Sequence, residues 1–69
     1  MKMTRLALKQ GIMGLTNSET AWSCVVDYLE GKFSHDDLVC VLKGVYYAAM
    51  VKKIIALVEI YQSMQEEGK

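Results

Sequence analysis

The sequence predicts an all-α protein, an antiparallel helical hairpin with a long second helix that pairs with a second copy as a homodimeric helical bundle. Pro is absent, and hydrophobic residues make up 52% of the chain, which disfavours a disordered or linker-rich protein. Two capping signals, at residues 16–19 and 34–37, each precede a stretch in which apolar residues recur every three or four positions. Only residues 31–33 separate the two predicted helices, so the helices must run antiparallel.

The first predicted helix spans residues 17–30. Thr16 and Glu19 have the spacing of a capping box, in which each side chain accepts a hydrogen bond from the other residue's backbone. Gly31 ends this helix, because glycine adopts the left-handed conformation of a helix end without strain. The preceding N-terminal segment, residues 1–15, can hold a short helix that Gly11 would end.

The second predicted helix spans residues 35–67, with Ser34 as its N-cap and two aspartates in its first turn. Its apolar residues form two lines where a single amphipathic helix needs one. The first line contains Cys40, Gly44, Tyr47, Val51, Ile54, Val58 and Tyr61. The second line contains Val39, Leu42, Tyr46 and either Ala49 or Met50, and continues past Lys53 to Leu57, Ile60 and Met64. Both lines need other apolar residues packed against them to shield them from water.

We therefore expect residues 1–69 to form a single helical domain that associates with a second copy. A 14-residue first helix covers under half of the second, and a core of this size rarely stabilises a chain alone. Residues 1–15 and the second copy should share the cover of the distal half. The predicted dimer interface consists of Val51, Ile54, Leu57, Val58 and Tyr61.

Charge and hydropathy disfavour several classes of function. Eight basic and eight acidic residues give a formal net charge of zero, so the chain as a whole does not attract nucleic acid. The longest uncharged stretch in the apolar half is residues 44–51, well short of the ~20 residues that cross a bilayer. No signal-peptide pattern is found near the start. We expect a cytoplasmic protein that binds neither nucleic acid nor membrane.

The sequence offers no group of catalytic or metal-binding residues, and we expect no enzyme, metal or cofactor. His35 is the only histidine, and Asp36 and Asp37 beside it suit a helix start. Cys24 and Cys40 would lie level across the hairpin. Helix axes ~8 to 10 Å apart rarely bring α-carbons within the ~7 Å that a disulfide needs, so two buried free thiols are expected.

Protein binding is the function that these features favour. Tyr46 and Tyr47 are adjacent and point about 100° apart on a helix, so they cannot both enter one core. Tyrosine and methionine are enriched at protein interfaces. The predicted partner-binding residues are Tyr46, Tyr47, Met50 and Lys53.

Two alternatives remain open, a dimeric helix-turn-helix DNA-binding regulator and a structural oligomerisation module. The acidic start of the second helix would face phosphates in a DNA reader, which disfavours the first alternative. Tyrosines in the apolar lines and the short first helix disfavour a coiled-coil spacer.

In size and layout the chain resembles the small phage-encoded anti-quorum-sensing proteins. The resemblance rests on the capped first helix, the tight turn and the apolar run Val45-Tyr46-Tyr47-Ala48-Ala49-Met50. It implies a dimeric anti-activator that binds a quorum-sensing regulator of the LasR type and the pilus-assembly ATPase PilB of a bacterial host. The protein would then act in the host cytoplasm.

Overall fold

The computed structural model describes residues 3–67 and contains four α-helices within them: α1 (Arg5–Thr16), α2 (Glu19–Leu29), α3 (His35–Lys43) and α4 (Ala48–Glu67). The prediction of an all-α fold is confirmed. The first two residues of the predicted N-terminal segment lie outside the described residues. Within residues 3–67, none of the helices is both long enough and apolar enough to cross a membrane.

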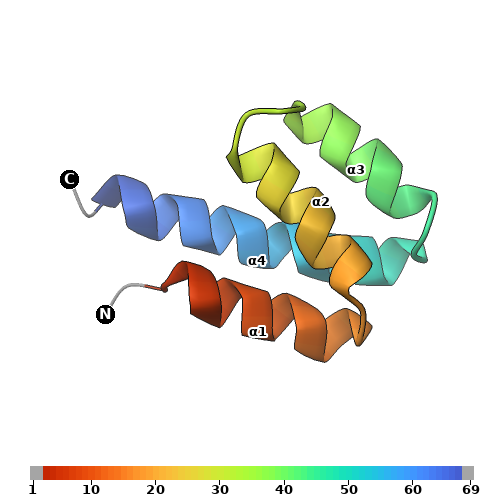
Figure 1. The fold of residues 1–69 in the computed structure, drawn as a ribbon, viewed down its shortest axis with the longest axis horizontal. Coiled ribbons are helices and arrows are strands. Elements are labelled where there is room, and N and C mark those ends of the chain that lie inside the picture. The colour runs from red at the N-terminus through yellow and green to blue at the C-terminus, as the bar shows by residue number, and fades with distance from the viewer. Residues whose placement is uncertain (1–2, 68–69) are drawn as a thin grey trace.

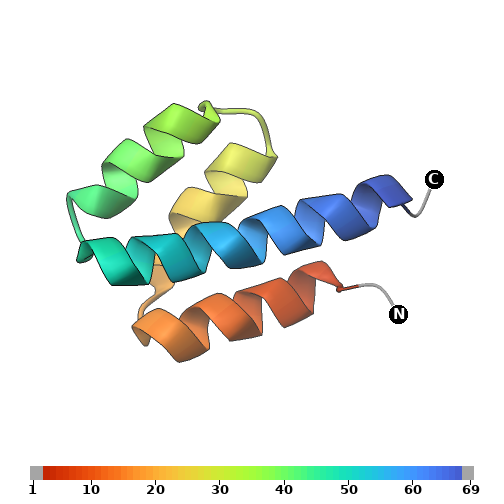
Figure 2. The ribbon, with the colours of Figure 1, turned by 180° about the vertical axis from the view of Figure 1, so that it is seen from behind.

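Helices α1 and α4 lie side by side and run antiparallel, with both chain ends at the same end of the molecule (Figure 1). The 20 residues of α4 extend for about 30 Å, most of the 34 Å long axis of the molecule. Helix α2 crosses this pair, and α3 returns beside α2 and contacts α4. From behind, α1 and α4 lie in front of α2, so neither α2 nor α3 covers this side of the pair (Figure 2).

Every helix contributes two or three side chains to one core. The contributing residues are three or four positions apart within each helix, which is the spacing of a single helical face. All of them are at most 3% exposed. They are Leu8 and Ile12 of α1, Ala21 and Val25 of α2, Leu38 and Leu42 of α3, and Val51, Ile54 and Val58 of α4.

Helix α1 is longer than the sequence suggests, because it continues through both Gly11 and Gly14. Thr4 is its N-cap, and the hydroxyl of Thr4 accepts a hydrogen bond of 3.0 Å from the Ala7 amide. The helix ends at Asn17, whose left-handed backbone (φ 54°) is a conformation that asparagine tolerates. Helix α1 packs against α4, so the described part of the N-terminal segment helps to cover α4 as expected, and the cover expected from a second copy stays a prediction.

The predicted capping box at Thr16 is wrong. Thr16 is the last residue of α1, and its hydroxyl donates hydrogen bonds to the Ile12 and Ser18 carbonyls. Ser18 is the N-cap of α2 and accepts from the Thr20 amide at 3.2 Å. The first predicted helix, residues 17–30, thus begins two residues later than expected because Asn17 is needed to end α1.

The capping signals around the next connection are confirmed. Ser34 and Asp37 form a capping box, with both side-chain to backbone hydrogen bonds at 3.2 Å. Gly31 has φ 81°, the left-handed conformation expected at the end of the preceding helix. Helix α3 begins at His35 as predicted.

The single helix predicted over residues 35–67 is wrong, because residues 44–47 divide it into α3 and α4. The amides of Val45 and Tyr46 both donate to the Leu42 carbonyl, at 3.1 and 2.8 Å, and close a tight turn there. The break lets α3 pack against α4, so that Leu38 and Leu42 join the same core as Ile54. A continuous helix could not fold back to bury its own two apolar lines. The described residues therefore form four helices, where the sequence predicted a two-helix hairpin.

Candidate functional site: two uncovered apolar surfaces

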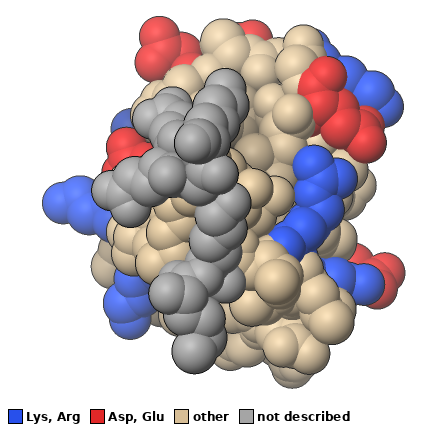
Figure 3. Space-filling model, turned by 90° about the vertical axis from the view of Figure 1, so that its left-hand side faces the viewer, with Lys and Arg blue, Asp and Glu red and all other residues tan. Residues whose placement is uncertain are grey.

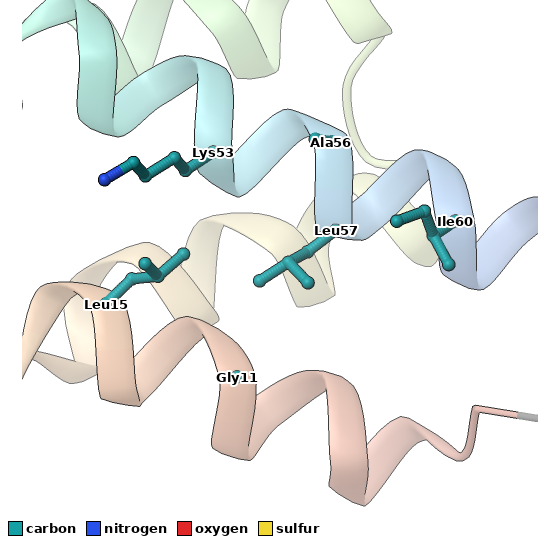
Figure 4. Close-up of a pocket in the computed structure, with 6 residues that line it drawn as sticks. All are labelled: Gly11, Leu15, Lys53, Ala56, Leu57 and Ile60. Carbon is teal, nitrogen blue, oxygen red and sulfur yellow. The ribbon is translucent and has the colours of Figure 1, made fainter.

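The side of the α1–α4 pair that α2 and α3 leave open carries a groove. Gly11 and Leu15 of α1 form one side, and Lys53, Ala56, Leu57 and Ile60 of α4 form the other. We call it the α1–α4 groove (Figure 4). Its volume is about 430 Å³, and it is open to solvent along its length. Apolar side chains line it except at Lys53, so it suits an apolar occupant better than a polar one.

Small residues on α1 make the groove possible. A Cβ at Gly11 would lie 3.3 Å from Cδ1 of Leu57, so glycine lets the Leu57 side chain lie over the α1 backbone. A Cβ at Gly14 would meet nothing within 4 Å, because the space above this part of α1 is empty. Gly11, which the sequence predicted to end a short helix, instead lies within α1 and lines the groove.

Lys53 is the one charged residue among those that line the groove. Its side chain extends from α4 along the groove, toward the end where Leu15 lies (Figure 4). Within the described part of the chain, ion pairs join Lys32 to Asp27 and to Glu30, and none involves Lys53. Lys53 is thus placed to meet an anionic group of an occupant.

A second apolar surface lies where α3 turns into α4. Val41, Val45 and Tyr47 are 42%, 57% and 66% exposed, within seven consecutive positions around the tight turn. We call these three residues the corner patch. Large apolar side chains clustered at the surface are typical of contact sites for other proteins.

The four predicted partner-binding residues do not share one surface. Tyr47 belongs to the corner patch and Lys53 to the groove. Tyr46 and Met50 are half-buried and pack against the core. The Tyr46 hydroxyl is buried and finds no hydrogen-bond partner among the described residues.

Most of the predicted dimer interface lies inside the single chain. Val51, Ile54 and Val58 are at most 3% exposed, so their assignment to a dimer interface is wrong. The reason is that α1 and the folded-back α3 supply the cover that the sequence interpretation assigned to a second copy. Tyr61 is half-buried against the core, and Leu57 lines the groove.

Sequence reasoning missed Gly11, Leu15, Ala56 and Ile60 as groove residues. One signal was present, since Leu57 and Ile60 belong to the second apolar line, which the core leaves partly uncovered. The position of α1 against that line could be known only from the fold.

The two cysteines differ in environment, and both are free thiols. Cys24 is half-buried, whereas Cys40 is exposed, so the prediction of two buried thiols is wrong for Cys40. Burial raises the pKa of the Cys24 thiol, and the nearby Asp27 carboxylate raises it further. In residues 3–67 no three His, Cys, Asp or Glu side chains gather in a group that could hold a metal ion.

Residues 3–67 form a small bundle of four helices with one internal core, and this part of the chain leaves the groove and the corner patch uncovered. No protein-family model matches the sequence, and neither a curated protein nor a solved structure matches it. The function must therefore be argued from the surfaces themselves.

Proposed function

We propose that the chain is a small, non-catalytic interaction protein that binds another protein through the corner patch. The observation that carries the proposal is Tyr47, which is 66% exposed and lies within six positions of two exposed valines in the sequence. Tyrosine combines a large apolar ring with a hydroxyl that can pair, and it is among the residues that contribute most to binding energy at interfaces.

Charge supports a protein partner over nucleic acid. The formal net charge is zero, and positive and negative side chains are intermixed around the end of the molecule where α1 begins and α4 ends (Figure 3). A DNA reader needs one positive surface to neutralise phosphates. Helix α3, the helix that would enter the groove of DNA in a helix-turn-helix reading, has Asp36 and Asp37 in its first turn.

A regulator of the LasR type and the ATPase PilB are the first candidate targets, on the resemblance to phage anti-quorum-sensing proteins. Helix α2 has an N-cap, but it is Ser18 and not the Thr16 capping box that the resemblance assumes, and the run Val45 to Met50 spans a turn and not the middle of a long helix. The targets therefore follow from the resemblance, and the binding surface follows from the fold. In this role the protein would inhibit a regulator by occupying part of its surface.

The test measures binding of the purified chain to each purified candidate. Tyr47→Ala should weaken binding by about 2 kcal/mol or more if Tyr47 fills a pocket of the partner. Leu6→Ala is the matched control, because Leu6 is 63% exposed on α1, outside the corner patch and the groove. It should bind as the wild type does, and both variants should keep the wild-type helical signal.

Two outcomes would contradict the proposal. Normal target binding by both Tyr47→Ala and Val45→Ala would exclude the corner patch as the binding surface. Tight binding of duplex DNA that weakens steeply with salt would favour the DNA-reading alternative. If neither candidate protein is bound, the resemblance fails as a guide to the target.

A further inference from the structure

We infer that the α1–α4 groove is the contact surface of a two-fold homodimer in which the α4 helices of two copies pack antiparallel, centred on Ile60. This surface is separate from the corner patch, and its function does not depend on the proposed target. It also differs from the interface expected from sequence, which lies mostly in the core. The groove lies between α1 and α4, the two helices that stand in front of α2 in the view of Figure 2.

The residues along the open face of α4 suit packing against a second copy of the same helix. Ile60 is 45% exposed and lies between two small residues, Ala56 and Ser63, which are both exposed. Small residues let a partner helix approach closely, and the large residue between them fills the space that they leave. In an antiparallel pair centred on Ile60, each Ile60 would lie between the Ala56 and Ser63 positions of both helices.

The two ends of α4 are complementary in charge in this arrangement. Lys53 lies seven residues before Ile60, and Glu67, the last residue of α4, lies seven residues after it. An antiparallel two-fold pairing therefore brings Lys53 of each copy to the C-terminal end of the other copy's α4. That end has no basic residue in its last turn, and the sequence ends the helix with Glu66 and Glu67. A cation is favoured there by the helix dipole as well as by the acidic residues.

Helix α1 leaves room for the second copy beside the groove. Gly14, next in sequence to the groove residue Leu15, presents no side chain, and the space above it is empty, so a partner helix can approach the α1 backbone there. A standard interface buries about 800 Å² per partner, under a fifth of the 4465 Å² accessible surface of the chain.

A second copy fits the groove better than a helix of an unrelated protein, because both the charge pattern and the large and small residues of α4 match under one two-fold rotation. Isologous interfaces require this self-complementarity. On a helix of an unrelated protein, an acidic residue would have to lie opposite Lys53 by chance. A second copy supplies that acidic residue at the required distance along α4.

The experiment is sedimentation of the full chain over low to high micromolar concentrations. The wild type should associate to a dimer. Ile60→Glu should weaken association roughly tenfold or more, because it places two carboxylates face to face at the two-fold axis. Since Ile60 is half-exposed in the single chain, the variant should keep its helical signal. Val45→Glu, at the corner patch, is the control for a new carboxylate and should dimerise normally.

A charge exchange tests the antiparallel register itself. Lys53→Glu and Glu67→Lys should each weaken the dimer, and the double variant should restore much of the loss. A wild type that stays monomeric at all concentrations, or an Ile60→Glu variant that still dimerises, would overturn the inference. Absence of rescue in the double variant would overturn the antiparallel pairing. A wild type that stays monomeric, together with an Ile60→Glu variant that loses target binding, would assign the groove to the target.

Discussion

Gly11 of α1 lies directly against Leu57 of α4, so closely that a Cβ on Gly11 would stand 3.3 Å from the Leu57 Cδ1 atom. This approach sets the distance between the two helices that border the groove. Gly14, one turn further along α1, faces open space. The two glycines are in the same helix and lack the same atom, yet only one of them touches the opposite helix.

Alanine substitutions should separate these two roles. Gly14→Ala should raise the free energy of unfolding by roughly 0.5 to 1 kcal/mol, since alanine favours the helix and nothing opposes its methyl group. Gly11→Ala should gain less, because the Leu57 side chain must shift to accommodate the methyl group. Urea unfolding at one low protein concentration measures both, so that association does not add to the apparent stability. Equal gains would show that Gly11 does not limit the approach of α1 to α4.

Core and groove isoleucines on α4 should respond differently to the same small deletion. Ile54 is fully buried, and Ile54→Val should lower the free energy of unfolding by about 0.5 to 1.5 kcal/mol. Ile60→Val removes the same methyl group from a residue that is 45% exposed, and should change stability by less than about 0.5 kcal/mol. Urea midpoints at low protein concentration give the comparison. A larger cost at Ile60 would mean that the groove is covered within the single chain.

The capping box of α3 should contribute measurably to stability. Ser34→Ala removes the acceptor for the Asp37 amide and should cost about 1 kcal/mol. Ser23→Ala is the control, because Ser23 is exposed in the middle of α2, where alanine is at least as good a helix former. Thermal unfolding followed by circular dichroism should show a lower midpoint for the Ser34 variant alone. An unchanged midpoint would show that the cap is dispensable.

The buried Tyr46 hydroxyl should be a source of instability. It is buried without a hydrogen-bond partner among the described residues, so Tyr46→Phe removes a desolvated polar group and leaves the ring in place. The variant should be more stable than the wild type by about 1 kcal/mol. Tyr47→Phe, in which the hydroxyl belongs to an exposed residue, should leave stability unchanged. A loss of stability in Tyr46→Phe would reveal that this hydroxyl is bonded in solution.

The two thiols should react at different rates. Burial and the Asp27 carboxylate raise the Cys24 pKa, so at mildly alkaline pH less of this thiol is in the reactive thiolate form. In a Cys40→Ser variant, Cys24 should react slowly with Ellman's reagent, and its rate should rise at higher pH than expected for an ordinary thiol. Asp27→Asn should lower the Cys24 pKa and speed the reaction. The exposed Cys40, left alone in a Cys24→Ser variant, should react faster. Similar rates for the two would contradict the burial of Cys24.

The sequence by itself determined the local features whose cause lies within a few residues. It predicted helices throughout, the cap at Ser34 and the left-handed end at Gly31, because capping hydrogen bonds and the freedom of glycine act over one turn. The apolar spacing also predicted that residues such as Ile54 are turned toward a core. These features depend little on the rest of the chain.

Only the tertiary structure decided where the long apolar stretch breaks and what covers it. Neither a proline nor a strong turn signal marks residues 44–47, and Val45, Tyr46 and Tyr47 fit a continuous helix equally well by local preference. The turn is favoured because it lets Leu42 of α3 and Ile54 of α4 share a core with α1. This stabilisation comes from contacts between residues far apart in the sequence, so no short stretch of the sequence predicts it. For the same reason Gly11 could not be recognised as a contact residue from sequence. Its role depends on Leu57, which lies opposite it only after α1 and α4 have packed together.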